Sequence, residues 1–414
     1  MLSHGAPGGR IFQRLRGLPR SFWFSFLAAC VFVTAVEYTA EHMIEAESAP
    51  GVAQTIFNFS GFYQRVVAAP RDPIPRHTAV VEIDPEKEPE VASLHTICEQ
   101  RAMMARLLCG VASAQPQVIV VDKFFLPRDC EQDSQLRAAV REISEHTPVV
   151  VGRRIMDEGF VQPAMVFPGS QRFSEGVVNV HPDTRRLPLY WRAYAAAEDA
   201  ERGASAVLWD TLALTAAKAY GVNGRVITSA GGYPYISFLE PRDFPRVTVR
   251  QVFAGVPGAP QEGRFCPAGI PSEDLRVLRG KAVLIGELNR DMDEHPTVLG
   301  AMSGLHLQAN YVEALIDGRH YKGMSVLDYA LGFALMVGLE LILLVYHDKW
   351  LLAGGLILLL FLALGALVLF MTMLLHWYVN PALLGAMVVL IKVLHLAFGR
   401  AERAIPHHQV PVAG

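Results

Sequence analysis

Hydrophobic residues in this chain are concentrated in four long stretches with a mostly polar region between the first two. The stretches occupy residues 22–36, 325–345, 351–375 and 381–398. A bilayer core about 30 Å thick needs roughly 20 apolar residues per helix. The pattern predicts an integral membrane protein with transmembrane helices over residues 21–40, 325–346, 350–375 and 380–398, and one large polar domain after the first helix.

The charges that flank these stretches predict how the chain crosses the membrane. Arginines at positions 10, 14, 16 and 20 precede the first stretch, and glutamates follow it. Lys and Arg are retained on the cytoplasmic side during insertion. We therefore expect residues 1–20 in the cytoplasm, 41–324 outside it and 399–414 as a short cytoplasmic tail, in a bacterial inner membrane. Arg319 and Lys322 lie on the outer side and run against this rule.

Two other interpretations of the first stretch stay open. Residues 27–30, LAAC, match a bacterial lipoprotein cleavage box. A basic region followed by a short apolar core also suits a removable signal peptide. The apolar run continues past Cys30 to Val36, whereas a lipidated Cys normally opens a polar linker, so an uncleaved anchor is favoured.

Short β-branched runs alternate with helical periodicity in the outer domain. Strands are expected over residues 78–83, 117–121, 148–151 and 282–285, and helices over 96–114, 133–145 and 305–316. Residues 155–275 predict shorter elements, with one at 176–180, a helix around 205–220 and a loop at 231–234. Apolar strands that alternate with helices indicate a largely parallel sheet covered on both faces. The predicted fold class is an α/β extracytoplasmic domain plus an all-α transmembrane region.

Four charged residues follow the ends of predicted strands: Asp84, Asp122, Arg153 and Glu287. Ligands of open sheets tend to bind beyond the carboxyl ends of the strands. We expect these side chains to meet at one edge of the sheet as ligand-binding candidates. The alternative for each residue alone is that it caps the following turn or helix.

Composition adds few constraints. The chain has 51% hydrophobic residues and a net charge of -3. These values are averages over the apolar membrane helices and the polar domain. This balance gives no basic face for nucleic acid. Cys and His spacings do not suggest zinc, and we expect no cofactor.

Four of the five cysteines fall in the outer domain, where an oxidising compartment permits disulfides. Cys98 and Cys109 would be about 16 Å apart on one helix, which disfavours a bond between them. Cys109 lies in the apolar phase of that helix and is expected to be a buried free thiol. We expect one bridge, between Cys130 and Cys266, which both lie in Pro-containing loops.

Several sequence blocks resemble one known family. They are VVEID at 80–84, VIVVDKFF at 118–125, VVNVHPDTRRLPL at 177–189, PYISFL at 234–239 and GKAVLIGELNRDMDEHPTVLGAMSGLHLQANYVEALIDG at 280–318. These blocks resemble the type-two CHASE domain, a sensory extracellular domain associated with bacterial cyclases and histidine kinases. The resemblance implies three transmembrane helices after the domain, as expected here. Asp293, in the last and most specific block, joins the ligand-binding candidates.

The sequence departs from that family at three places. Gln308 stands where the family commonly has His, and the polar residues 288–292 replace a Gly-rich stretch. In such receptors a cytoplasmic kinase or cyclase follows the last helix, whereas residues 399–414 are too few for one. We therefore expect the signal to pass through partner proteins.

Three ionisable residues fall inside the expected spans. Glu340 in the second span and Lys392 in the fourth each lie about seven residues, roughly 10 Å, from the cytoplasmic boundary, with His395 nearby. Because these spans run parallel, the opposite charges can meet at one depth. Ionisable groups inside a bilayer are costly unless paired and are functional candidates. The alternatives are a structural pair, or a Lys that extends to the headgroups.

These observations favour a non-enzymatic membrane-anchored sensor or accessory receptor. Its expected partners are membrane lipid, a protein in the membrane or periplasm, an unknown small ligand and, as an open possibility, a second copy of the chain. The alternative is a structural or assembly subunit of a larger membrane complex that uses the domain as an interaction surface. An extracytoplasmic enzyme is least favoured, because the sequence has no GxSxG or HExxH.

Overall fold

The chain divides into two compact units, Ala53–Lys322 and the combination of Met1–Val52 with Gly323–Gly414. The computed structural model describes residues 74–128, 130–223, 235–254, 265–266, 272–288, 293–323 and 349–375. It also describes residues 377–378, short pieces between 330 and 346, and positions 27 and 31. Each unit is considered by itself.

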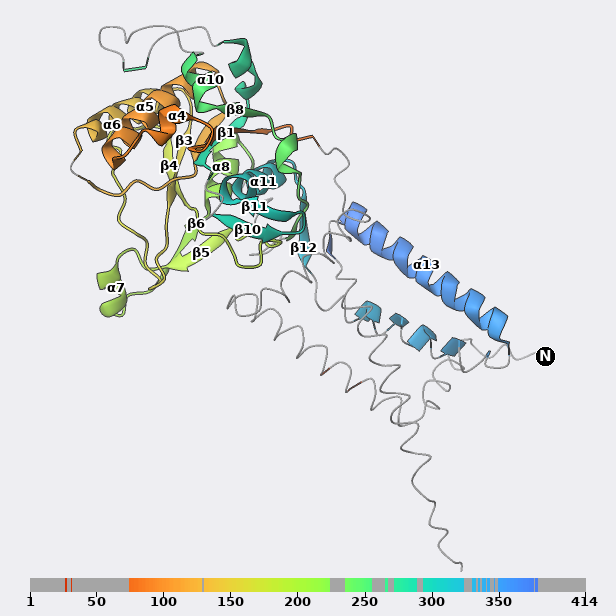
Figure 1. Cartoon of the computed structure of the whole chain (residues 1–414). Helices are drawn as coiled ribbons and strands as arrows, with labels where there is room; N and C mark the ends of the chain where they lie inside the picture. Colours follow the sequence, from red (N-terminus) through yellow and green to blue (C-terminus); the bar gives the residue numbers. More distant parts are fainter. Residues whose placement is uncertain are drawn as a thin grey trace, which may run out of the picture. The chain divides into compact units, whose positions relative to one another are not determined.

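A six-stranded parallel sheet forms the centre of the first unit (Figure 1). Its strand order is β4-β3-β2-β9-β1-β8. The strands are β1 (Thr78–Ile83), β2 (Val118–Val121), β3 (Val149–Arg153), β4 (Phe173–Val177), β8 (Arg246–Thr248) and β9 (Ala282–Glu287). In β1, Ala79 and Val81 contribute to one hydrophobic core and Val80 to another. This two-sided burial explains why the strands are apolar at successive positions, and the expected largely parallel sheet is confirmed.

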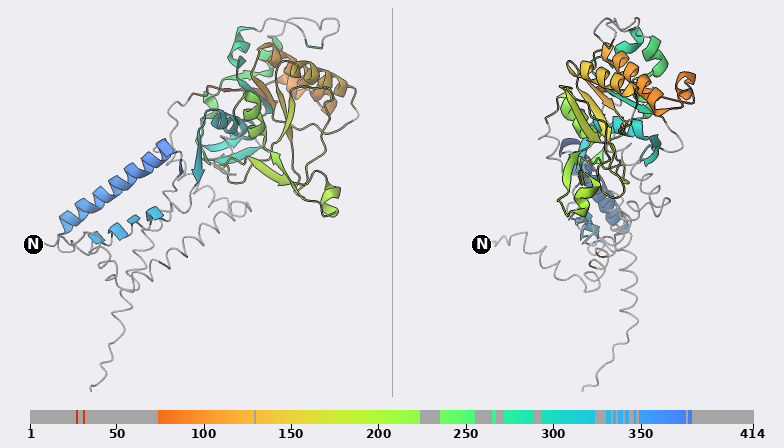
Figure 2. Two further views of the ribbon diagram at one scale, coloured as in Figure 1. Left: turned by 180° about the vertical axis from the view of Figure 1, so that it is seen from behind. Right: turned by 90° about the vertical axis from the view of Figure 1, so that its left-hand side faces the viewer.

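Helices cover both faces of the sheet (Figures 1 and 2). The core on one face includes residues from α4 (Pro89–Ala92), α5 (Ile97–Ser113), α6 (Gln132–Ser144) and α10 (Val249–Ala254). The core on the other face includes residues from α8 (Leu212–Tyr220) and α11 (Gly304–Ile316). The unit is therefore a three-layer α/β domain, as the alternation of strands and helices predicted.

Side-chain caps explain where the main helices begin. Thr96 Oγ1 accepts the Glu99 backbone N–H at 3.1 Å, and the Glu99 carboxylate accepts the Thr96 N–H at 3.0 Å, so α5 starts with a capping box. Thr211 and Ser303 accept backbone N–H groups in the first turns of α8 and α11. The predicted helices at 96–114, 133–145 and 305–316 agree with α5, α6 and α11 to within a residue at most ends.

The elements of residues 155–275 were predicted less well. A helix around 205–220 is wrong in its first part, because β6 (Val207–Asp210) pairs antiparallel with β5 (Tyr190–Ala193) and α8 begins only after Thr211. The element expected at 176–180 is β4, which lies slightly earlier. The loop expected at 231–234 lies outside the described residues. The hairpin β5–β6, with α7 (Ala197–Glu201) in its connection, extends away from the sheet as an arm (Figure 2).

The described residues of the unit also form shorter elements. They are the 3-10 helices η1 (Pro241–Asp243) and η2 (Glu273–Leu278), the antiparallel hairpin of β10 (Glu294–Thr297) and β11 (Gly300–Ser303), and β7 (Tyr235–Ile236) paired antiparallel with β12 (His320–Gly323).

Cys98 and Cys109 do not bond each other, as expected, but the expected Cys130–Cys266 bridge and the expected free thiol at Cys109 were wrong. Cys98 bonds Cys130, and Cys109 bonds Cys266. The expected Cys130–Cys266 bridge fails because α5 packs beside α6, so the first turn of α5 meets the loop that precedes α6. Cys109 is buried as expected but is not free. Residues 265–266 are held nearby by backbone N–H bonds to the Glu142 carboxylate, at 2.8 and 3.2 Å.

The described part of the second unit contains α13 (Trp350–Leu375), followed by β13 (Trp377–Tyr378). Within α13, Trp350–Thr372 is the one helix in the described ranges that is long and apolar enough to cross a membrane. It coincides with the span predicted over 350–375. Pieces of a shorter apolar helix, Ala330–Leu339, fall within the span expected at 325–346. The spans expected at 21–40 and 380–398 lie outside the described residues, apart from positions 27 and 31.

Candidate ligand-binding site

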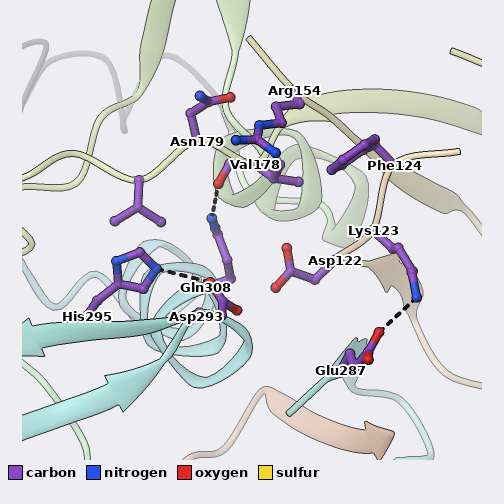
Figure 3. A pocket seen from close by; sticks show the side chains of 12 residues that line it. Asp122, Lys123, Phe124, Arg154, Val178, Asn179, Glu287, Asp293, His295 and Gln308 are labelled. Carbon is purple, nitrogen blue, oxygen red and sulfur yellow. Dashed lines mark hydrogen bonds and ion pairs between the residues drawn. The ribbon is translucent and has the colours of Figure 1, made fainter. Parts of the chain in front are cut away.

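A cavity opens at the carboxyl edge of the central strands β2 and β9 (Figure 3). Its volume is about 440 Å³, within the usual range of small-molecule sites. Most of its lining side chains are polar or charged. The lining residues are Asp122, Lys123, Phe124, Arg154, Val178, Asn179, Val180, Glu287, Asp293, His295, Gly304 and Gln308.

Three of the five ligand-binding candidates from the sequence line this cavity: Asp122, Glu287 and Asp293. Asp122 follows β2, and Glu287 ends β9, the strand next to β2. Parallel strands present their carboxyl ends at one edge, so residues distant in sequence meet there. Asp293 reaches the same place from the segment that precedes β10.

Asp84 and Arg153 lie at the same edge of the sheet but do not line the cavity. The Asp84 carboxylate accepts the Glu86 backbone N–H at 3.1 Å and bonds Lys87 Nζ at 2.7 Å. Burial alone raises the pKa of Asp84, but the Lys87 ammonium and these hydrogen bonds outweigh it and lower the pKa. Asp84 therefore organises the turn after β1, which was the alternative weighed from the sequence.

Arg153 pairs with Glu175 of the neighbouring strand at 2.6 Å. The next residue, Arg154, lines the cavity instead. Its guanidinium lies 5.9 Å from the centroid of the Phe124 ring. The predicted strand end is correct, but of the two adjacent arginines it is Arg154, and not the candidate Arg153, that lines the cavity.

Asp122 has an unusual electrostatic environment. The pKa of its carboxyl is raised to about 7, mainly by burial and also by the nearby Asp293 carboxylate, while His295 opposes the shift. No hydrogen bond or ion pair joins the Asp122 carboxyl to another residue in the part of the chain that the structure describes. Near neutral pH this group is therefore poised between the neutral and the ionised form.

Asp293 is held between His295 and the start of α11. Its Oδ1 lies 3.2 Å from His295 Nε2. Its backbone carbonyl accepts the Gly304 N–H at 2.9 Å. A Cβ on Gly304 would lie 2.4 Å from Asp293 Oδ2, so only glycine leaves room for the carboxylate in its present position. His295 was not a candidate from the sequence, although it lies two residues after Asp293.

Gln308, where the family commonly has His, has a defined role in the cavity wall. Its Nε2 donates to the Val178 carbonyl at 2.9 Å and so joins α11 to the segment after β4. Asn179 fixes that segment from its other side, since its side-chain amide bonds both the N–H and the carbonyl of Ile155. The walls of the cavity are thus tied together by amide hydrogen bonds.

Lys123 and Glu287 form an ion pair across the ends of β2 and β9. Lys123 Nζ lies 2.9 Å from the Glu287 carboxylate, and both side chains are partly exposed. Lys123 and Phe124 were missed as site residues, although both follow a predicted strand end within the quoted block at 118–125. The signal was available, because residues just beyond such an end lie at the carboxyl edge.

A buried ionisable pair lies where α11 packs on β1. His306 Nε2 is 3.4 Å from the Glu82 carboxylate, and Ser303 Oγ is 2.9 Å from His306 Nδ1. The interaction with the His306 imidazole is the main cause that lowers the pKa of Glu82. Neither residue lines the cavity. Their pairing fixes the first turn of α11, the turn that carries Gly304 into the site.

Metal binding has no support in the described ranges, where no three His, Cys, Asp or Glu side chains are grouped to hold an ion. Glu340, Lys392 and His395, the expected intramembrane relay, lie outside the residues that the structure describes.

The described residues thus form a parallel α/β domain with a polar cavity at its carboxyl edge, in a chain that also has a helix long and apolar enough to cross a membrane. Comparison with protein families matches residues 41–345 to the CHASE2 domain. The chain belongs to this family, whose members are sensory extracellular domains, as its sequence blocks suggested. No match to a curated protein or to a solved structure was found.

Proposed function

We propose that this chain is a non-enzymatic, membrane-anchored extracytoplasmic sensor or accessory receptor that binds a small polar ligand and signals through partner proteins. The observation that carries the proposal is the cavity at the carboxyl edge of the sheet, which combines a volume suited to a small molecule with convergent charged groups. Two disulfides in the same domain support an oxidising, extracytoplasmic location.

The position of α11 supports a route from the ligand toward the membrane. Gly304 and Gln308 of α11 line the cavity. Near its other end, the buried Glu313 carboxylate accepts the Arg76 N–H at 2.7 Å and the His77 N–H at 3.1 Å. The chain enters the sheet just after these residues, and α11 leads through β12 to the closing apolar stretches. A shift of α11 on ligand binding would therefore act on both chain connections.

Within the membrane, the proposed relay uses Glu340, Lys392 and His395. An ion pair between parallel helices resists separation, because each charge alone in the bilayer is costly. The charge swap Glu340→Lys with Lys392→Glu tests this pairing. Each single change should destabilise the protein and the double change should restore it; a double variant as unstable as the single ones would show that the residues do not pair.

The sensor function is tested on the full chain, purified from native membranes in mild detergent. A ligand that binds the folded state raises the melting temperature. We expect at least one class of small polar compound to do so in wild-type protein and to lose the effect in Asp293→Asn, with Asp84→Asn as the control at the same sheet edge. Purification as a stoichiometric multi-subunit complex that no compound stabilises would instead support the assembly role.

A further inference from the structure

The charged groups of the cavity differ in whether the protein already neutralises them. Lys123 and Glu287 pair with each other at 2.9 Å, and Asp293 lies 3.2 Å from His295. Two groups of opposite sign remain. Asp122 and Arg154 have no ion pair within the described ranges, and Arg154 has only the ring of Phe124, 5.9 Å away.

These two groups occupy different parts of the cavity. Figure 3 shows Arg154 and Asn179 in the upper part of the view, and Asp122 and Asp293 lower in it. The acidic side has two carboxylates and only one imidazole, whereas the other side has a guanidinium and an amide. The cavity therefore presents a negative pole and a positive pole to one small molecule.

Arg154 is exposed and solvated, whereas Asp122 is partly buried, and an ionised group with restricted access to water is costly unless an opposite charge compensates it. A cationic ligand group beside Asp122 would supply the missing countercharge. A guanidinium binds a carboxylate through two parallel N–H bonds, so Arg154 is suited to an anionic ligand group. A ligand with a single charge would leave one pole without a partner.

We propose that the cavity binds a small zwitterion, with its protonated amine against Asp122 and Asp293 and its carboxylate at Arg154. This inference rests on the proposed sensor function and narrows the ligand to one chemical class.

The protonation of Asp122 gives the proposal a pH signature. The titratable and charged groups that line the cavity with it are Asp293, His295, Lys123, Glu287 and Arg154, of which Asp293 and His295 act on its pKa. Because the pKa of Asp122 is about 7 in the empty cavity, an ammonium group must bind the ionised form and displace a proton below that pH. Affinity should fall by up to about tenfold for each pH unit below 7 and level off above it.

The test uses full-length protein in mild detergent and compares matched probes at millimolar concentration. The zwitterions are the common L-amino acids, β-alanine and 4-aminobutyrate; the single-charge controls are butyrate and butylamine; the neutral control is erythritol. Melting temperature identifies binding, and calorimetry at a series of pH values measures affinity. We expect one or more zwitterions to bind at least about tenfold more tightly than either single-charge control.

Two variants with matched controls locate the poles. Asp122→Asn and Arg154→Gln should each weaken zwitterion binding at least about tenfold. Arg153→Gln and Asp84→Asn, changed at the same edge but outside the cavity, should leave affinity unchanged. Asp122→Asn should also abolish the dependence of affinity on pH.

The outcomes separate this inference from the sensor function. Binding of erythritol, butyrate or butylamine without a preference for zwitterions would contradict the proposal that the ligand is a zwitterion. It would leave the proposed sensor function intact. Zwitterion binding that survives both cavity variants, or affinity that does not fall with pH, would overturn the assigned poles. No shift with any zwitterion would reject the ligand class, and no shift with any probe would count against both proposals.

Discussion

At Asp122 the stability of the fold and the proposed ligand binding favour different protonation states of the carboxyl group. Its carboxyl lies in a cavity, near Asp293, without a partner among the residues the structure describes, so the domain is more stable when it is neutral. Burial raises its pKa from the ordinary 3.8 to about 7. A group that costs stability in the free protein and can recover it by binding a cation is a feature of binding sites rather than of structural cores.

The raised pKa predicts how stability depends on pH. Between about pH 4 and pH 7 the folded state binds more protons at Asp122 than the unfolded state, so its contribution to the free energy of unfolding falls as pH rises and then levels off. The substitution Asp122→Asn removes this pH-dependent contribution to the free energy of unfolding. We expect the variant to equal wild type near pH 4 and to exceed it at pH 8 by on the order of 1–3 kcal/mol.

Thermal unfolding of the full chain across this pH range measures the difference. Asp84→Asn is the control of opposite sign, because the pKa of Asp84 is lowered and its ionised form stabilises the fold at neutral pH. It should be less stable than wild type at pH 8. Parallel pH profiles for wild type and Asp122→Asn would contradict the assignment.

Residues at the strand ends show how far the sequence predicted the site. Periodicity placed Asp122 and Glu287 at the correct edge, because a strand end fixes where the next residue lies. It did not separate Arg153 from Arg154, since the choice depends on Glu175, which pairs with Arg153 from a strand that the sequence indicated poorly. Which charged side chains line the cavity depends on contacts between elements, and these contacts are not visible in the sequence.

At the scale of elements, the sequence correctly predicted the helices and strands whose positions depend on neighbouring residues in the chain. The Thr96 and Glu99 cap fixed the start of α5, and the apolar run at 78–83 fixed β1. The arm at β5 and β6 was missed because its strands are paired with each other across Trp191 and Trp209 rather than buried in the sheet. The disulfides were mispredicted for a similar reason, because they depend on contacts between elements. The sequence of neither α5 nor α6 alone shows that the two helices pack side by side.

Close packing of α8 on β4 makes Gly176 a sensitive position. A Cβ there would lie 2.6 Å from Leu212 Cα and 2.9 Å from Leu212 N, so the backbone of α8 would have to move. We expect Gly176→Ala to lower the free energy of unfolding by about 1–3 kcal/mol or more. Gly354→Ala in α13, where nothing lies within 4 Å, is the matched control and should change little. Equal thermal stability of the two variants would contradict this packing.

The disulfides stabilise the face of the sheet that carries α5 and α6. Cys98–Cys130 closes a separation of 32 residues and Cys109–Cys266 one of 157. Chain-entropy arguments give losses of about 4 and about 5 kcal/mol when each bond is removed. We expect Cys109→Ala with Cys266→Ala to lower the melting temperature more than Cys98→Ala with Cys130→Ala. A reductant should lower it in wild type and leave the quadruple variant unchanged.

At the scale of the whole molecule, several features together bear on the location of the domain. The CHASE2 family is sensory and extracellular, the domain contains two disulfides, and α13 is long and apolar enough to cross a bilayer. The arginines before residue 21 predict the direction of the first crossing. Each feature alone is weak, but all of them favour an outer position for Ala53–Lys322, the unit that contains the cavity.

The arm allows a direct test of this sidedness. Gly203 is exposed, has a φ of 70°, and has open space around it, so an epitope inserted after it should be tolerated. We expect a protease added to spheroplasts to remove this epitope while the inner membrane is intact. The same epitope after Gly414 should be reached only after the membrane is permeabilised, because residues 399–414 are predicted to be cytoplasmic. If the Gly203 epitope were also protected until permeabilisation, the cavity would face the cytoplasm and could not sense an extracytoplasmic ligand.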